Sequence, residues 1–219
     1  MSDITVLLAD DHAAIRLGMR MVLETQPGLT VVGEAADGAR AVQMARALRP
    51  DVVLMDLRMP VVDGIQATRE ITAEALSKVL VLTPFAQDAY LFGALEAGAD
   101  GFLLKSAEPA DITAALQRVH AGDSVISPEV TARIVSAAVA ARTAPPIADA
   151  ASLDAAAAVE TLTAREREVL KCLGEGLSNQ LIGRRLDISE TTVKTHVSRV
   201  LAKLGLQSRV QAALFSRRS

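Results

Sequence analysis

Apolar and polar positions follow two different rhythms over the first 122 residues. Five short, almost wholly apolar runs have the length and composition of buried strands. They are residues 4–10, 30–35, 51–56, 78–83 and 101–105. The segments after them space their apolar residues three and four apart, as amphipathic helices do. They are residues 13–24, 39–48, 64–71, 89–98 and 111–122. Five strand–helix units with such apolar strands predict a doubly wound α/β domain with a five-stranded parallel sheet.

Polar residues stand where several of these strands end. They are Asp10 and Asp11 after the first strand, Asp56 after the third, Thr83 after the fourth and Lys105 after the fifth. Doubly wound sheets have their binding crevice outside this edge, so we expect these side chains to meet there. For any single one of the aspartates, the alternative role is to cap the helix that follows.

The three carboxylates at this edge need a counter-charge. Two unit charges about 4 Å apart repel by about 4 kcal/mol at an effective dielectric constant near 20, more than one salt bridge to Lys105 offsets. Oxygen ligands favour Mg²⁺, so we expect Asp10 and Asp11 to hold magnesium. Asp56 is then placed to act as a nucleophile toward a phosphoryl donor, because a carboxylate can form a mixed anhydride. Lys105 would pair with the phosphoryl oxygens and Thr83 would donate a hydrogen bond to one of them.

The pattern changes in residues 162–218, which predict four short helices. Thr163 and Glu166 have the spacing of a capping box, and Ser178 and Ser189 are placed to cap the second and third helices. Gly205 ends the third helix. The second and third helices, joined by a short turn, have the layout of a helix-turn-helix.

The third of these helices has one apolar stripe and one polar face. The stripe consists of Val193, Val197, Val200, Leu201 and Leu204. The polar face suits a DNA major groove, and its candidates for base edges are Lys194, Thr195 and Ser198. The candidates for phosphate contacts are Ser178, Asn179, Thr191, Thr192, Arg199 and Lys203. The alternative is a small helical bundle with a solvated, charged face.

Charge separates the two halves of this 219-residue chain, whose net charge of −3 comes from 23 basic and 26 acidic residues. Residues 162–219 contain 11 Lys and Arg and 5 Asp and Glu, a net charge of +6, which leaves 12 basic and 21 acidic residues, or −9, for the rest. The basic half therefore suits nucleic acid. Residues 141–160, rich in alanine with paired prolines, indicate a linker, although residues 153–160 also suit a short helix.

The remaining composition narrows the class of protein. One cysteine and three scattered histidines exclude an internal disulfide framework and a thiolate zinc site. No segment approaches the roughly 20 apolar residues of a membrane span, and the N-terminus lacks the pattern of a signal peptide. We therefore expect a cytoplasmic protein that does not associate with a membrane.

Four motifs make residues 4–122 resemble a response-regulator receiver domain, the phosphoacceptor half of a two-component system. They are ADD at 9–11, MDLRMP at 55–60 with DG at 63–64, LT at 82–83 and GFLLK at 101–105. The resemblance implies the strand order 2-1-3-4-5 and a sensor histidine kinase as phosphoryl donor. It also implies that the backbone carbonyl of Arg58 completes the Mg²⁺ shell with Asp56. Phe102 would be an aromatic switch that follows Thr83, with plain core packing as the alternative.

The second half resembles a LuxR-type helix-turn-helix through LTAREREVL, GLSN, TVKTHVSRVLAKLG and SRVQA. Together the two parts resemble the NarL/FixJ subgroup of transcription regulators, with a receiver at 1–122, a connecting helix and linker at 123–160 and a DNA-binding domain at 161–219. This implies operator DNA, a homodimer after phosphorylation and RNA polymerase as candidate partners. The last helix would either pair two copies on DNA or pack within its domain.

The chain departs from these families at a few positions. Pro84 has no backbone N–H to offer a phosphoryl group, and Ser106 stands where many receivers have proline. In the helix-turn-helix, Leu181 replaces a usual glutamate, and Gly183 replaces a usual alanine at a cost of about 1 kcal/mol in helix propensity.

Two alternatives to a phosphorylation-controlled regulator stay open. The first is a regulator that no longer needs phosphorylation, which is suggested by the missing backbone N–H of Pro84. A phosphohydrolase with Asp56 as covalent nucleophile commonly wants a second acid two residues later, where this chain has Arg58. We expect a regulator rather than an enzyme.

Overall fold

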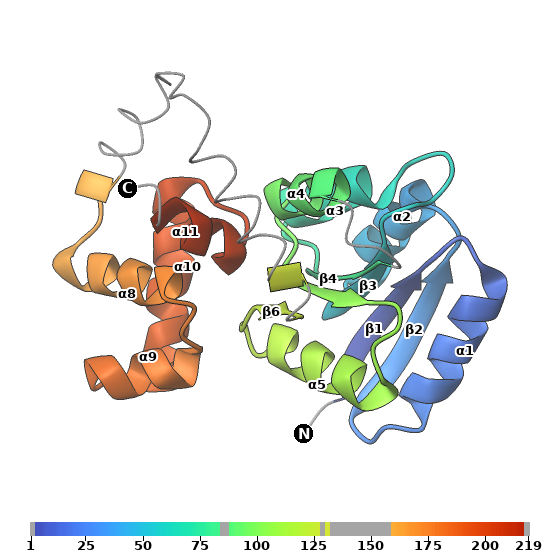
Figure 1. Cartoon of the computed structure of the whole chain (residues 1–219), viewed down its shortest axis with the longest axis horizontal. Helices are drawn as coiled ribbons and strands as arrows, with labels where there is room; N and C mark the ends of the chain where they lie inside the picture. The colour runs from blue at the N-terminus through green and yellow to red at the C-terminus, as the bar shows by residue number, and fades with distance from the viewer. Residues whose placement is uncertain (1–2, 84–87, 128–129, 132–158, 217–219) are drawn as a thin grey trace.

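The computed structural model of the chain describes residues 3–83, 88–127, 130–131 and 159–216 (Figure 1). Its first part contains one parallel sheet. The strands are β1 (Ile4–Ala9), β2 (Leu29–Ala35), β3 (Val52–Asp56), β4 (Lys78–Thr83), β5 (Gly101–Leu104) and β6 (Val125–Ile126). Their order across the sheet is β2-β1-β3-β4-β5-β6. The doubly wound α/β class is confirmed, and the first five strands have the expected order.

The sixth strand corrects the predicted count of five. β6 has two residues, and it pairs in parallel with β5 through Gly101 opposite Val125 and Phe102 opposite Ile126. A run of two apolar residues carries no periodicity, so only the packing beside β5 identifies it as a strand. The sheet thus extends beyond residue 122.

Helices cover both faces of the sheet. α1 (Ala13–Glu24) and α5 (Pro109–His120) lie on one face, and α2 (Gly38–Leu48), α3 (Gly64–Ala73) and α4 (Asp88–Glu96) lie on the other (Figure 1). Successive strand residues alternate between the two cores, so Leu8 packs with α1 and α5, whereas Leu7 packs with α2 and α3. Both faces are buried, which is why the strands are apolar along their whole length.

The second part is a cluster of short helices. They are α8 (Ala164–Gly174), α9 (Asn179–Leu186), α10 (Glu190–Leu204) and α11 (Arg209–Ser216). The predicted caps are present: Thr163 and Glu166 form a capping box, and the Ser178 and Ser189 side chains accept from the first turns of α9 and α10. Gly205 ends α10 with a positive φ of 64°, a conformation that favours glycine.

The predicted connecting helix and linker at 123–160 lie mostly outside the described residues. Residues 130–131 and 159–160 are helical. Val130 packs in the same apolar cluster as α2, α3 and α4. Among the helices that the structure describes, none is long and apolar enough to cross a membrane.

The two parts are in contact through residues that the structure describes. The turn between α5 and β6, residues 121–124, contacts α9 and α11, and the C-terminal end of α4 contacts α11 (Figure 1). Val210 and Leu214 of α11 belong to the apolar cluster that also contains α4. In this arrangement the apolar face of the last helix packs within the chain.

Candidate functional sites

The carboxyl ends of three strands bring two carboxylates and an ammonium into direct contact. The Lys105 Nζ lies 2.5 Å from Asp10 Oδ2 and 2.8 Å from Asp56 Oδ2. Asp10 and Asp56 are buried, being only 7% and 4% exposed. The parallel register explains this meeting, because β1 pairs with β3 so that Ala9 stands opposite Met55 and the next residues of both strands are aspartates. The predicted cluster is therefore formed by the fold itself.

The environment changes the proton affinity of both partners. Burial raises the pKa of Asp56, and nearby Asp10 raises it further, while Lys105 and the Arg58 backbone N–H act in the opposite direction. Burial by itself would lower the pKa of Lys105, but its hydrogen bonds to Asp10 and Asp56 prevail and raise it. Lys105 therefore stays charged and partly neutralises the two acids.

Asp11 and His12 extend the acidic edge toward solvent. The Asp11 side chain is 30% exposed and its Oδ1 lies 2.6 Å from the His12 Nδ1, while the His12 backbone N–H donates to Asp10 Oδ1 at 2.9 Å. One potential ligand atom each from Asp10, Asp11 and His12 lies within 4.8 Å of the others. His12 is an addition to the residues expected from the sequence, and its place directly after the acidic pair is the only signal that points to it.

These residues fit a divalent cation. The donor set offers carboxylate oxygens, which are the ligands that Mg²⁺ prefers. The Asp56 Oδ1 atom is buried and has no hydrogen-bond partner of ordinary geometry among the described residues. A buried carboxylate oxygen without a partner is costly and commonly indicates a bound ion or a reactive role. Arg58, whose carbonyl the resemblance assigns to the same shell, lies exposed two residues after Asp56.

The loop after Asp56 is held by two local features. Val61, which is 88% exposed, has a left-handed φ of 68°, and the Val62 N–H donates to the Pro60 carbonyl at 2.8 Å, closing a tight turn. Gly64 packs directly on the end of β3, where a Cβ atom would lie 2.0 Å from the Asp56 carbonyl oxygen. Only glycine fits there, which explains the DG pair after the strand.

The two predicted switch residues lie on neighbouring strands. Thr83 ends β4 and is 7% exposed, and its register partner is Leu104 of β5. Phe102, on β5, is completely buried in the core beneath α3 and α4. Its position fits core packing directly, and its assignment as a switch stays a prediction. Pro84 lies outside the described residues.

The helix-turn-helix has the predicted division between a buried and a polar face. Val193, Val197 and Val200 of α10 are buried, and Leu201 and Leu204 pack against the same core. The outward residues of α10 are exposed side chains. They are Thr191, Thr192, Lys194, Thr195, Ser198, Arg199 and Lys203. Lys194 lies 3.5 Å from Glu190, an exposed pair one turn apart that leaves the ammonium accessible.

The other candidates for phosphate contacts have partners inside the chain. Lys203 Nζ lies 2.7 Å from Glu166 Oε2 and donates to the Thr161 carbonyl at 3.2 Å. The hydrogen bond from Lys203 to Glu166, together with the one from the Thr163 backbone N–H, lowers the pKa of Glu166 to about 2. Asn179 is 2% exposed and faces the first domain. Ser178 caps α9 beside it.

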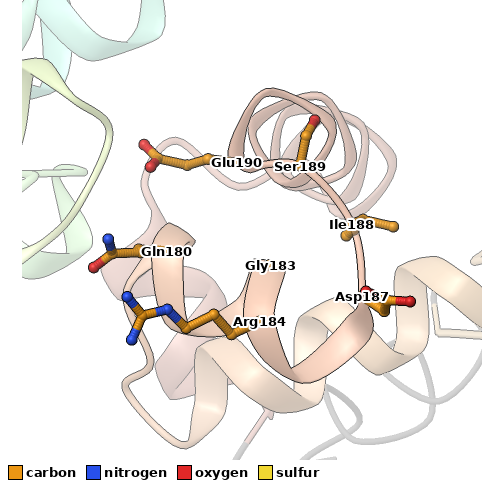
Figure 2. Close-up of a pocket in the computed structure, with 7 residues that line it drawn as sticks. All are labelled: Gln180, Gly183, Arg184, Asp187, Ile188, Ser189 and Glu190. Atoms are coloured by element: carbon orange, nitrogen blue, oxygen red, sulfur yellow. The ribbon is translucent and has the colours of Figure 1, made fainter.

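An open hollow lies between α9 and the start of α10 (Figure 2). Its lining residues are Gln180, Gly183, Arg184, Asp187, Ile188, Ser189 and Glu190. Gly183 allows the close packing at its base, because a Cβ atom there would lie 2.7 Å from the Ile188 carbonyl oxygen. The glycine that departs from the family therefore has a packing reason.

The fold and these two sites define a protein with a receiver joined to a DNA-binding module, and the comparisons with known proteins agree. The model of the response regulator receiver domain matches residues 6–117, and the model of the bacterial regulatory proteins of the luxR family matches residues 160–216. The chain belongs to the response regulators that combine these two domains, a family of transcription regulators and not of enzymes.

Individual relatives match along almost the whole chain. The nitrate/nitrite response regulator protein NarL of Escherichia coli K12 is 39% identical over 96% of this chain and 94% of its own length. The transcriptional regulatory protein LiaR of Bacillus subtilis is 39% identical over 99% and 98%. The crystal structure of the response regulator ChrA of a heme-sensing two-component system is 35% identical, with a TM-score of 0.53, and covers 100% of this chain and 98% of that one.

Proposed function

We propose that this response regulator is controlled by phosphorylation of Asp56. The observation that carries the proposal is the buried Asp56 Oδ1, which has no hydrogen-bond partner of ordinary geometry among the described residues, while Oδ2 of the same carboxylate is 2.8 Å from Lys105 Nζ. One oxygen is thus held by a cation and the other is left for a new bond. A carboxylate oxygen of this kind can act as the nucleophile that forms an acyl phosphate.

The donor is a phosphohistidine of a sensor kinase. The P–N bond to the donor histidine breaks as a P–O bond to Asp56 forms, and the leaving imidazole takes up a proton. Lys105 stays charged and would pair with the phosphoryl oxygens. Thr83 follows Leu82, the register partner of Asp56 on β4, and would donate a hydrogen bond to one of these oxygens. A Mg²⁺ ion held by Asp10, Asp11, Asp56 and the Arg58 carbonyl would offset the negative charge of carboxylates and phosphoryl group.

The basic second domain is the output. Its exposed α10 face suits the major groove of an operator, and Lys194, Thr195 and Ser198 are the proposed base readers. Thr191, Thr192 and Arg199 are exposed on the same helix and would contact flanking phosphates. We propose that phosphorylated copies bind as a homodimer.

Intact-mass analysis after incubation with acetyl phosphate and Mg²⁺ tests the phosphoacceptor. Wild type should gain one phosphoryl group, and Asp56→Asn should gain none. Asp3→Asn is the matched control, because Asp3 is exposed and directly precedes β1, at the opposite edge of the sheet from Asp56. Uptake by Asp56→Asn, or none by wild type, would contradict the proposal.

A regulator that works without phosphorylation is the second candidate, favoured by Pro84. It predicts that DNA affinity is identical for wild type and Asp56→Asn, with and without phosphodonor. Our proposal predicts that the donor raises the affinity of wild type alone.

A further inference from the structure

A carboxylate of the receiver occupies the N-terminus of the first helix of the helix-turn-helix. The Asn179 backbone N–H donates to Asp123 Oδ1 at 3.0 Å, and the Asn179 side-chain Nδ2 donates to the Gly122 carbonyl at 3.4 Å. The first helix of such a motif crosses the DNA backbone, and its N-terminal N–H groups are donors for phosphate. Asp123 therefore lies where we expect an oxygen of DNA.

A buried guanidinium completes this anion site. Arg209 Nη1 donates to Asp123 Oδ1 at 3.0 Å, to the Gly122 carbonyl at 2.8 Å and to Asn179 Oδ1 at 3.0 Å. Its Nη2 donates to the Leu177 carbonyl at 2.6 Å, and its side chain is only 9% exposed. A helix N-terminus and an arginine together are the two kinds of donor that proteins use most for phosphate.

We infer that Asp123 is an internal substitute for a DNA phosphate. The receiver carboxylate and the DNA backbone compete for the same donors, the Asn179 N–H and the Arg209 guanidinium. While Asp123 holds these donors, a state that we call the closed chain, the protein cannot complete its contact with the duplex. This inference rests on the proposed function, because it assumes that the helix-turn-helix binds DNA. It adds the contact by which the receiver holds the output domain back.

Asp123 competes only for the donors that would contact the DNA backbone. The side chains of α10 that are proposed to contact bases stay exposed. Lys194, Thr195 and Ser198 of α10 are exposed while Asn179 is 2% exposed. Phosphate contacts fix the position of a protein on the duplex, and base contacts supply the specificity. The closed chain therefore has its base readers available but lacks an anchor that positions them.

The interface between the two domains also includes α4, the helix that follows Thr83 in the receiver. Gln211 Nε2 of α11 donates to the Glu96 carbonyl at 2.9 Å and to the Leu95 carbonyl at 3.4 Å, at the C-terminal end of α4. α4 is the first helix after Thr83, so a movement of that helix on phosphorylation would loosen the contact of α11. Arg209, in the same helix, would then release Asp123.

Three forms of the intact, unphosphorylated chain test the inference with a fluorescent mixed-sequence DNA duplex. Asp123→Asn keeps the size of the side chain but removes the charge that pairs with Arg209. It should bind the duplex at least about fivefold more tightly than wild type, the lower end of typical coupling between two sites. Asp111→Asn removes the same charge from an exposed position on α5 and should stay within about twofold of wild type, because it reports only the net-charge effect.

A spectroscopic readout follows the contact directly. In ¹⁵N–¹H spectra of the intact chain, the Asn179 amide signal should move in Asp123→Asn, and phosphorylation of wild type should move it in the same direction. A shared shift would identify release of Asp123 as the event that phosphorylation causes.

The outcomes separate the two proposals. If phosphorylated wild type binds the duplex but Asp123→Asn gains no more than Asp111→Asn, the competition is refuted and the proposed function stands. If no form of the chain binds the duplex, the proposed function fails and the inference fails with it.

Discussion

The acidic edge of the receiver sheet and the polar face of α10 are both clusters of polar side chains, but they are built in opposite ways. At the strand ends, Asp10 and Asp56 are almost fully buried and their charge is offset within 3 Å by Lys105. On α10, Lys194 and Arg199 are exposed and their charge is screened by water. Buried charges are strongly coupled to one another, whereas exposed charges act almost independently. The first arrangement suits chemistry on one atom, and the second suits recognition of an extended partner.

Removing the ammonium from the buried cluster should have the largest effect on stability. Lys105→Met leaves Asp10 and Asp56 facing each other without a cation, so we expect the free energy of unfolding in urea to fall by about 2 to 3 kcal/mol. Mg²⁺ should restore more stability to Lys105→Met than it adds to wild type, because the ion replaces the missing charge.

The control for this experiment is Lys171→Met, an exposed lysine of α8. It should change the unfolding free energy by less than about 0.5 kcal/mol, with or without Mg²⁺. An equal response to Mg²⁺ in Lys105→Met and wild type would contradict the coupling of Lys105 to a metal site.

Exposed charges on α10 should affect binding and not folding. Lys194→Ala should weaken binding to a selected operator by about 1 to 3 kcal/mol and relax the preference at one base position. Arg199→Ala should weaken binding equally for all sequences and lower the slope of log affinity against log salt by about 1. Fluorescence anisotropy at several salt concentrations measures both effects. Lys171→Ala, which removes the same charge away from α10, should leave the base preference unchanged.

The ion pair of Glu166 and Lys203 joins a buried carboxylate to a partly exposed ammonium, and its contribution to stability should depend on pH. The pKa of Glu166 is about 2 in the folded domain, below its ordinary value of 4.5. Its contribution to stability is therefore fully present above about pH 4.5 and is lost as the pH falls toward 2. Because Lys203 is 37% exposed and water screens the pair, we expect a contribution of about 1 to 2 kcal/mol.

Urea unfolding at pH 6 and at pH 2 measures this loss. Glu166→Gln keeps a side chain that can complete the capping box but removes the charge. It should therefore be less stable than wild type at pH 6, by a smaller margin at pH 3, and about equally stable at pH 2. A difference of unchanged size at pH 2 would assign the effect to packing and not to the ion pair.

The smallest effect is expected at Gly183. Alanine gains about 1 kcal/mol in helix propensity, but its Cβ would lie 2.7 Å from the Ile188 carbonyl oxygen. We expect Gly183→Ala to be slightly destabilising, by less than about 1 kcal/mol in thermal unfolding. Gly18→Ala in α1, where a Cβ would meet nothing within 4 Å, should instead be stabilising. Stabilisation by both substitutions would mean that the turn adjusts freely.

The elements and the buried cluster could be predicted because they depend on short-range patterns. Strand and helix periodicities place each element, and the capping residues Thr163, Ser178 and Ser189 mark the helix starts. Asp10, Asp56 and Lys105 were expected together because the ends of parallel strands share one edge. β6 was missed because two residues have no pattern.

What the sequence by itself determined is therefore the two domains, their elements and the acidic edge, since these follow from local periodicity and from the geometry of parallel strands. Only the tertiary structure decided which partners the long polar side chains take. It pairs Lys203 with Glu166 and Arg209 with Asp123, residues 37 and 86 positions apart in the chain. Such pairs depend on how surfaces meet, and no local pattern encodes which of many equivalent charges will face one another.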